Sequence, residues 1–205
     1  MKRILFQGDS ITDCGRIRAT DETNGRHLGF GYAALVAADL GNCEVGAYEF
    51  LNLGLGGSKI LDVYNHMIQD IIEIAPDYMS IMVGVNDAIN HLETKRFESL
   101  YQWLIDDVKA ALPNIKIMLL SAFCDEWSEQ KFPGVNKDVK EKIAVTQQLA
   151  ERNKLPFLDT QEILDKALKE APLGYWTAPD GIHPTVFLHK RIADAWIKTF
   201  LEELK

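Results

Sequence analysis

Short apolar runs alternate with longer amphipathic segments along almost the whole chain, and this alternation constrains the fold more than any other feature. The apolar runs predict strands at 4–6, 49–52, 78–83, 115–121 and 156–158. Helical spacing of apolar residues predicts helices at 32–40, 60–74, 97–112, 135–153, 160–170 and 185–204. Gly41, Pro76 and Pro113 are expected to end the first three of these helices. Strands that alternate with helices indicate a parallel sheet covered on both faces.

The predicted fold class is α/β, a flavodoxin-like three-layer α/β/α sandwich with a five-stranded parallel sheet of order 2-1-3-4-5. Continuous apolar strands fit burial on both faces of such a sheet. We expect a single domain over 1–205, because 47% of the 205 residues are apolar and no linker divides the chain. The segment 122–136 is expected to be a long loop, and loops of that length are often functional.

Charge and cysteine usage narrow the class of protein. The net charge of −8 argues against a nucleic-acid partner, because phosphate binding needs clustered Lys and Arg. The apolar stretch at 4–6 is too short for a signal peptide, and no run approaches the length that spans a bilayer. Cys14, Cys43 and Cys124 show neither zinc-ligand nor disulfide spacing, which favours reduced thiols in a cytoplasmic protein.

Polar clusters follow the first three strands and precede the last helix, and the first cluster contains a candidate nucleophile. Gly8-Asp9-Ser10 comes directly after the first strand. A serine at a strand-to-helix turn can project its hydroxyl from the sheet while its N–H lies at a helix N-terminus, where negative charge is stabilised. A serine N-cap after a tight turn is the structural alternative. The string also differs from the G-x-S-x-G nucleophile elbow.

The second and third clusters contain candidate hydrogen-bond donors. The stretch after the second strand includes Gly54, Gly56 and Gly57, and glycines let a backbone approach a ligand and point N–H groups at it. A flexible turn explains the same glycines equally well. After the third strand, Asn86 could offer its amide to an oxyanion or form an Asx turn. Asp87 beside it is expected to orient the loop.

The fourth cluster offers a general base. Asp180 and His183 are three residues apart on one loop, followed by Pro184, which suits the first position of a helix. A general base needs an imidazole held in one tautomer by a carboxylate, and one short turn could bring the two groups together. An Asp-Gly turn followed by a histidine cap is the alternative, but it leaves Ser10 without a clearly placed base.

The four clusters together carry a family resemblance. The chain resembles the GDSL or SGNH hydrolase superfamily, named for its Ser, Gly, Asn and His blocks, at Gly8-Asp9-Ser10, Gly57, Asn86 and Asp180-x-x-His183. The longer string 8–16 and the segments 80–87 and 157–161 look like the bacterial acetylxylan esterase branch, which removes acetyl groups from xylo-oligosaccharides. Substrate identity is less portable than mechanism, because function lives in the site and its loops.

The resemblance implies an acyl-enzyme mechanism that needs no metal or cofactor. Ser10 would be the nucleophile, His183 the base and Asp180 its orienter, with an oxyanion hole formed by Ser10, Gly57 and Asn86. Gly57 is preferred over its neighbouring glycines by its spacing in the second cluster. The resemblance also implies a small acylated carbohydrate as substrate, a cytoplasmic location, no membrane partner and assembly into a homo-oligomer.

Several side chains near these blocks are candidate substrate contacts: Asp9, Asp13, Arg16 and Trp176. Asp13 and Arg16 could hydrogen-bond a polar substrate, or form a surface ion pair worth little. Trp176 and the neighbouring Tyr175 could stack on a sugar ring or pack in the core.

Three further residues near the expected site remain open. Cys14 is a rival nucleophile, but the sequence places no base beside it. His189 is expected at the surface or as a cap, and Trp127 on the long loop could cover the pocket or a subunit contact.

Other functions stay open at this point. A thioesterase or lysophospholipase would use the same chemistry on longer acyl chains. A non-catalytic flavodoxin-like binding module would explain the glycine-rich turns but not Asp180 and His183. A metal-dependent hydrolase that uses Asp9, Asp180 and His183 is the weakest alternative.

Overall fold

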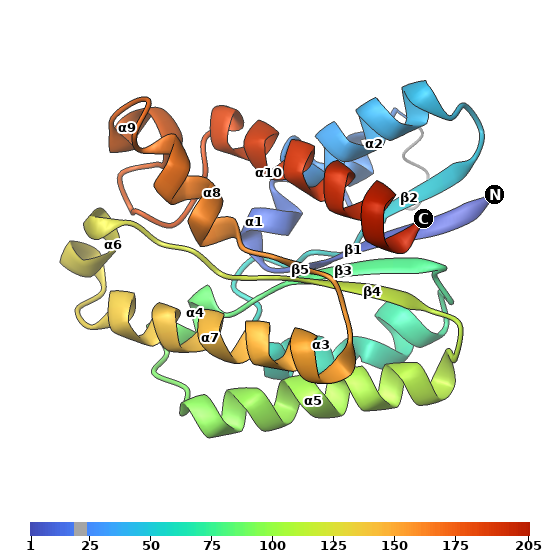
Figure 1. Cartoon of the computed structure of the whole chain (residues 1–205), viewed down its shortest axis with the longest axis horizontal. Helices are drawn as coiled ribbons and strands as arrows, with labels where there is room; N and C mark the ends of the chain where they lie inside the picture. Colours follow the sequence, from blue (N-terminus) through green and yellow to red (C-terminus); the bar gives the residue numbers. More distant parts are fainter. Residues whose placement is uncertain (19–23) are drawn as a thin grey trace.

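Five parallel strands form the central sheet of the computed structural model, which describes residues 1–18 and 24–205. The strands run in the order β2-β1-β3-β4-β5, as predicted, and every neighbouring pair is parallel. Their bounds are β1 Lys2–Gly8, β2 Tyr48–Asn52, β3 Tyr78–Met82, β4 Lys116–Leu120 and β5 Phe157–Leu158. Figure 1 shows helices stacked on both faces of this sheet.

Strand β1 shows why the apolar runs become buried strands. Ile4 and Phe6 face one core cluster and Leu5 faces the other, and all three are fully buried. Side chains alternate between the two faces of a strand, so a run buried on both faces must be continuously apolar. Each such side chain contributes about 1.5–3 kcal/mol through its burial.

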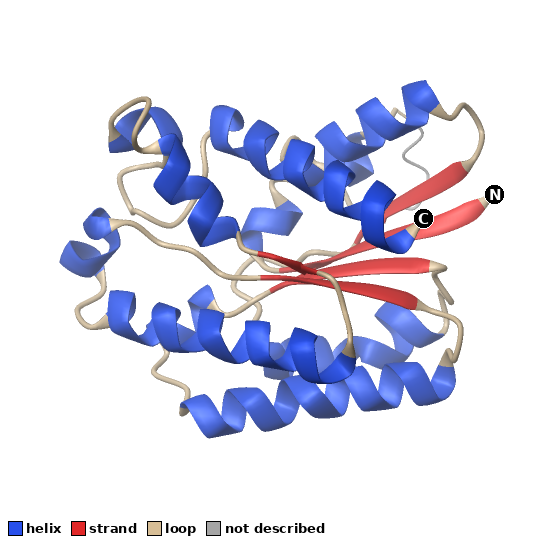
Figure 2. Ribbon diagram, in the orientation of Figure 1, coloured by secondary structure: helices blue, strands red, loops and turns tan. Residues whose placement is uncertain are grey.

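Two layers of helices cover the sheet (Figures 1 and 2). Residues of α2 (Tyr32–Cys43), α8 (Thr160–Ala167) and α10 (Val186–Thr199) form one core cluster with the sheet. Residues of α3 (Ile60–Met67), α5 (Thr94–Ala111) and α7 (Val135–Asn153) form the other. The flavodoxin-like α/β/α sandwich predicted from the sequence is therefore confirmed.

Helix ends differ from the prediction in several places. Helix α5 begins at Thr94 instead of 97, and α8 ends at Ala167 instead of 170. Gly41 does not end α2, which continues to Cys43, because the interior of a helix tolerates a glycine at a cost of about 1 kcal/mol. The predicted helix 60–74 is α3 followed by a π-helical turn, η2 (Ile68–Ile72), and the helix 185–204 is α10 followed by a second, η3 (Phe200–Leu204). A 3-10 turn, η1 (Arg26–Leu28), precedes α2.

Short helices lie beyond the carboxyl ends of the strands, where turns and loops were expected. They are α1 (Ser10–Asp13), α4 (Val85–Ile89), α6 (Glu126–Lys131) and α9 (Leu173–Trp176). The expectation that 122–136 is a loop throughout was wrong, because Asp125 caps α6 by accepting a hydrogen bond from the Trp127 N–H at 2.8 Å. A helix this short and polar has no apolar periodicity to reveal it.

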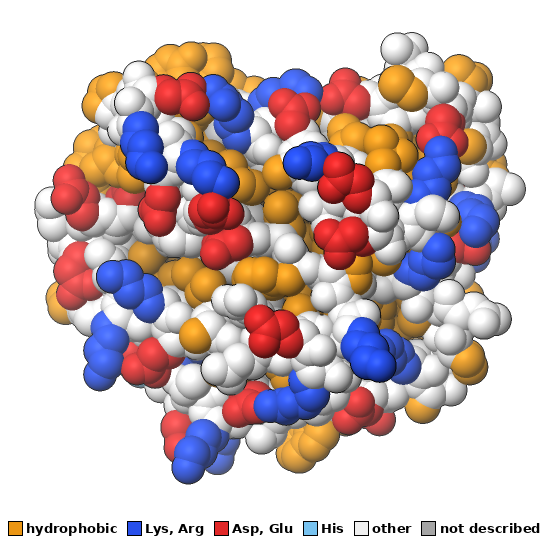
Figure 3. All heavy atoms as spheres, in the orientation of Figure 1, with side chains coloured by type: hydrophobic (Ala, Val, Ile, Leu, Met, Phe, Trp, Pro, Cys, Tyr) orange, Lys and Arg blue, Asp and Glu red, His pale blue; other side chains and the backbone are white. Residues whose placement is uncertain are grey.

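The surface is mixed in charge. On the face shown in Figure 3, acidic and basic side chains are interspersed, with apolar patches between them. Among the described residues, no helix is both long enough and apolar enough to cross a membrane.

Candidate active site

The turn after β1 presents Ser10 at the first position of α1. The Asp9 carboxylate caps this helix by accepting the Ile11 N–H at 3.0 Å. The turn requires Gly8, because a Cβ there would lie 2.3 Å from Thr12 Oγ1 and 2.6 Å from the Met82 carbonyl oxygen. The backbone therefore turns close against the sheet and leaves Ser10 only partly covered.

Ser10, His183 and Asp180 form a continuous chain of hydrogen bonds. Ser10 Oγ lies 2.8 Å from His183 Nε2, and His183 Nδ1 lies 2.8 Å from Asp180 Oδ2. An ionised carboxylate only accepts, so Nδ1 carries the ring proton and Nε2 presents its lone pair to the serine hydroxyl. The structure thus brings together the three side chains that the sequence suggested would meet.

The Asp180 carboxylate is built to stay ionised. Burial raises its pKa, but hydrogen bonds from the N–H and ring of His183 and from the Ile182 N–H together lower it below its ordinary value. An anionic Asp180 holds the ring in one tautomer and can stabilise an imidazolium.

The loop that carries this pair is a small hairpin rooted in the core. Thr177 and Pro184 form an antiparallel bridge, and the Ala178 N–H donates to the His183 carbonyl at 2.8 Å. Ile182 is 3% exposed and packs in a core cluster with residues of α4 and α7. The His183 side chain itself is 47% exposed, so a buried residue anchors a solvent-facing imidazole.

The glycine-rich loop after β2 has one unused N–H among its three glycines. The Gly54 N–H donates to Asn52 Oδ1 at 2.9 Å, and the Gly56 N–H donates to Asp13 Oδ2 at 3.2 Å. The Gly57 N–H makes no hydrogen bond within the described residues, and its φ of +83° belongs to the left-handed region that favours glycine. These contacts favour Gly57 as the free donor of this loop.

Asn86 is the second residue of α4, beside the same loop. Its side-chain nitrogen donates to the Ser58 carbonyl at 3.2 Å, which uses one of its two hydrogens. Asp87 accepts the Ile60 N–H with its two carboxylate oxygens at 3.1 and 3.3 Å and so ties α4 to the start of α3. Burial raises the pKa of Asp87 to about 6.

Asp9 was expected to contact substrate, and the structure contradicts this. It is 1% exposed, one oxygen caps α1, and the other has no partner among the described residues. Burial raises its pKa to about 7, and the nearby Asp87 raises it further, whereas the Ile11 N–H and His183 lower it. Asp9 is a buried structural carboxyl group beneath the catalytic turn.

Asp13 and Arg16 are used inside the protein. Asp13 accepts from the Gly56 N–H and pairs with Arg18 at 2.9 Å, so its ion pair differs from the Asp13–Arg16 pair considered as the alternative. Arg16 Nε donates to the Gly54 carbonyl at 2.8 Å. Both side chains therefore brace the glycine-rich loop, and a direct contact of either with substrate stays a prediction.

Trp176 belongs to the core, so the suggestion that it stacks on a sugar was wrong. It is 3% exposed and packs in the core cluster that α2, α8 and α10 form with the sheet. Its indole nitrogen donates to the Ala171 carbonyl at 3.1 Å. Its neighbour Tyr175 is 45% exposed and stacks on Phe187, with ring centroids 4.3 Å apart. Adjacent residues on a short helix point in different directions, which the sequence did not reveal.

Cys14 does have a histidine beside it, contrary to the sequence analysis. His189 is 3% exposed, not a surface residue, and its Nε2 lies 3.4 Å from Cys14 Sγ. The Tyr32 N–H donates to His189 Nδ1, so Nε2 carries the proton and donates to sulfur. Burial raises the pKa of the thiol and lowers that of His189 to about 4, so this pair is not an activated nucleophile.

Asp125 is the site residue that sequence reasoning missed. Its N–H donates to the Gly181 carbonyl at 2.9 Å, and its carboxylate accepts the Thr177 hydroxyl, so it binds the hairpin at two points. An aspartate before a polar helix signals an N-cap, but nothing local signals contact with a hairpin more than fifty residues away.

A parallel sheet with this Ser–His–Asp chain at its carboxyl edge places the protein among hydrolases of carboxylic esters. Residues 6–191 match the GDSL-like lipase/acylhydrolase family, and the chain belongs to that family.

Similar proteins and solved structures support the family assignment. The chain is 32% identical to the acetylxylan esterase of Geobacillus stearothermophilus over 96% of its length and 93% of the relative. The crystal structure of that esterase superposes with a TM-score of 0.85 at 30% identity, covering 97% of this chain and 93% of the other. A GDSL-like lipase structure from Parabacteroides merdae gives 0.86 at 30% identity, with 97% and 94% covered.

Proposed function

We propose that this protein is a serine esterase that removes O-acetyl groups from carbohydrates such as xylo-oligosaccharides. The observation that carries the proposal is the unbroken chain from Ser10 Oγ through the His183 ring to Asp180, with 2.8 Å at each step. The chemistry follows from the protonation states of this chain, and the substrate class from the relatives.

The reaction begins when His183 Nε2 takes the Ser10 proton as Oγ attacks the acetyl carbonyl. The carbonyl π electrons move to oxygen, and the oxyanion is held by the N–H of Ser10, the N–H of Gly57 and the free amide hydrogen of Asn86. His183 returns the proton to the leaving sugar hydroxyl as its ester bond breaks. Water then attacks the acetyl-Ser10 carbonyl by the same route and releases acetate.

The Geobacillus relatives support these roles. Structures of catalytic mutants of that esterase carry alanine in place of a serine, an aspartate and a histidine, and the last two positions are three residues apart. Asp180 and His183 have the same spacing here. A further mutant structure of the same Geobacillus esterase describes it as an acetyl-xylooligosaccharide esterase, which is the basis for the substrate class we propose.

The open site suits a small acyl group on a bulky polar alcohol. The His183 side chain is 47% exposed, and Ser10 is only partly covered. A lysophospholipase would need an extended apolar groove for its acyl chain.

Acetate release from acetylated xylo-oligosaccharides tests the proposal against a Ser10→Ala control. We expect acetate from the wild type and near-background release from a folded Ser10→Ala protein. A series of 4-nitrophenyl esters separates the acyl classes, because an acetyl esterase loses rate steeply beyond acetate. Rates that rise with chain length would favour a thioesterase or lysophospholipase, and hydrolysis by pure Ser10→Ala protein would exclude Ser10 as the nucleophile.

A cytoplasmic location and self-association also belong to this proposal. All three cysteines are free, which suits a reducing compartment. Tyr175, Val186 and Phe187 are large apolar side chains, each at least 45% exposed, which suits a subunit contact. Light scattering of the purified protein tests the second point, and a monomeric mass at all concentrations would contradict it.

A further inference from the structure

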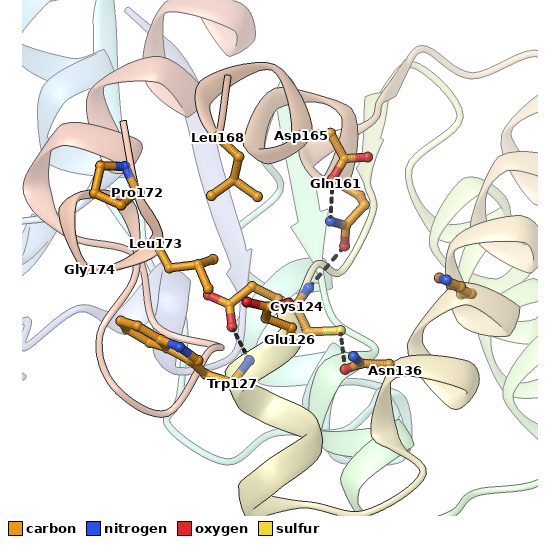
Figure 4. A pocket seen from close by; sticks show the side chains of 12 residues that line it. Cys124, Glu126, Trp127, Asn136, Gln161, Asp165, Leu168, Pro172, Leu173 and Gly174 are labelled. Atoms are coloured by element: carbon orange, nitrogen blue, oxygen red, sulfur yellow. Dashed lines mark hydrogen bonds between the residues drawn. The ribbon is translucent and has the colours of Figure 1, made fainter. Parts of the chain in front are cut away.

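A cavity lies beside the hairpin that carries Asp180 and His183, and its lining includes neither Ser10 nor His183. It has a volume of about 750 Å³, within the range of small-molecule sites. Figure 4 shows it between the start of α6 and α7 on one side and α8 and α9 on the other. Its lining residues belong to segments that follow β4 and β5, at the same edge of the sheet as Ser10.

One wall of the cavity is apolar and includes an aromatic ring. Trp127 is half-buried and stands beside α9, since a Cβ on Gly174 would lie 3.3 Å from the indole ring. Leu168 and Leu173 extend this wall. A sugar ring has an apolar C–H face, which an indole ring can cover while the hydroxyls around the rim stay free to hydrogen-bond.

The polar lining divides into groups that hold the wall and groups that are unused. The Gln161 side chain accepts the Cys124 N–H at 3.0 Å and donates to Asp165 at 3.0 Å (Figure 4), so it is fully engaged. Glu126 and Lys140 line the cavity without a hydrogen bond or ion pair to any residue that the structure describes. They supply an acceptor and a donor of the kinds that sugar hydroxyls match.

The charge of the lining selects against anions. Three carboxylates, Asp125, Glu126 and Asp165, line the cavity with one cation, Lys140. This excess of negative charge repels phosphorylated or carboxylated ligands and does not oppose a neutral polyol. Cys124 does not make the cavity a second catalytic site, because burial raises the pKa of its thiol and the thiol donates to Asn136 Oδ1 at 3.3 Å.

The cavity and the catalytic hairpin share a wall. Asp125 lines the cavity and its N–H donates to the Gly181 carbonyl, between Asp180 and His183. Gly181 packs against this wall so closely that a Cβ would lie 2.4 Å from Asp125 Oδ1. A ring held in the cavity therefore lies directly behind the loop that presents the base.

We propose that this cavity is a carbohydrate-binding subsite that holds an unacetylated sugar unit of an oligosaccharide, with Trp127 as the stacking face and Glu126 and Lys140 as hydrogen-bonding groups. The ligand class rests on the proposed function, whereas the site itself rests on the lining described above. The subsite gives the long segment after β4 a role, and it makes an oligosaccharide a better substrate than a small ester.

Titration with xylotetraose, which carries no acetyl group, tests the subsite without any hydrolysis. Isothermal calorimetry should show saturable binding to the wild type and at least a tenfold weaker Kd for Trp127→Ala. The matched control is Trp103→Ala, which removes an exposed tryptophan from α5, lies outside this cavity and should bind like the wild type. Trp127→Phe keeps an aromatic face and should recover part of the affinity.

Weaker binding by Trp127→Ala could come from disturbed packing or from a lost contact with the sugar. Glu126→Gln separates the two, because it changes only one exposed carboxylate to an amide. This variant should keep the thermal unfolding midpoint of the wild type and bind xylotetraose more weakly. Equal affinity in the wild type, Trp127→Ala and Glu126→Gln, or no binding by the wild type at millimolar xylotetraose, would overturn the subsite. If 4-nitrophenyl acetate is still hydrolysed in a Ser10-dependent way in that case, only the subsite fails and the esterase proposal stands.

Discussion

The two halves of the proposed catalytic chain are held in different ways. Ser10 stands on a turn that is continuous with β1 and is pressed against β3, where Gly8 leaves no room for a side chain. His183 stands on a hairpin that returns to the body of the protein through the buried Ile182 and the hydrogen bonds of Asp125. The proposed nucleophile is thus positioned by the sheet, whereas the proposed base is positioned by a few contacts of one loop.

The two halves should therefore respond differently to substitutions. A serine held by strand backbone should keep its place in most surface variants. A loop that depends on close approach at Gly181 can shift as a unit, and a misplacement of about 1 Å can cost about a hundredfold in rate. The two halves should therefore separate in mutant kinetics.

Among the variants that keep Ser10, His183 and Asp180, the largest effect is expected at Asn86. Asn86→Ala removes a hydrogen that the oxyanion would use, and kcat should fall between about a hundredfold and a thousandfold with little change in KM. Steady-state kinetics on 4-nitrophenyl acetate measures this. Asn153→Ala, which breaks contacts between α5 and α7 far from the sheet edge, serves as the control and should keep its kcat. A normal kcat in Asn86→Ala would remove Asn86 from the oxyanion hole.

The next largest effect is expected at Gly181, where the hairpin packs against Asp125 and Ser128. Gly181→Ala places a Cβ 2.3 Å from the Ser128 nitrogen and 2.4 Å from Asp125 Oδ1, so the loop must move and kcat should fall about a hundredfold. Gly46→Ala is the matched control, because its φ of +76° is as strained but no atom lies within 4 Å of the added Cβ. It should lose a little stability and no activity. Equal kcat in the two variants would show that the hairpin does not depend on this contact.

The smallest effect concerns stability on the nucleophile side. The pKa of Asp9 is about 7 in the folded protein against 3.8 ordinarily, so from about pH 4 to pH 7 the unfolded chain loses its proton first and stability falls as pH rises. Asp9→Asn removes this dependence. In urea unfolding, the free energy of unfolding of the variant relative to that of the wild type should rise by a few kcal/mol between pH 4.5 and pH 8. An unchanged difference at the two pH values would contradict a buried, protonated Asp9.

Local patterns predicted the architecture well. The alternation of apolar runs with helices predicted a doubly wound parallel sheet, whose flavodoxin-like strand order is the one observed. Helix α7 was predicted at its observed bounds because its apolar residues repeat with helical spacing. Ser10, Asp180 and His183 could be proposed because each stands in a short polar cluster at a strand or helix end.

Contacts between distant segments could not be predicted in this way. Trp176 was misassigned because one short helix, α9, buries it and exposes Tyr175. Asp125 was missed because its partners lie on another loop, and Cys14 was thought to lack a histidine because His189 comes from a helix at the other end of the chain. Tertiary contacts decided all three.

The most direct test of the account is whether Ser10 is the nucleophile that His183 activates. Treatment with a fluorophosphonate, followed by peptide mass spectrometry, should find one adduct on Ser10 and esterase activity lost in proportion to labelling. His183→Ala should slow the labelling of the same serine by at least about a hundredfold. An adduct on another residue, or full activity in a protein whose Ser10 is completely modified, would contradict the account.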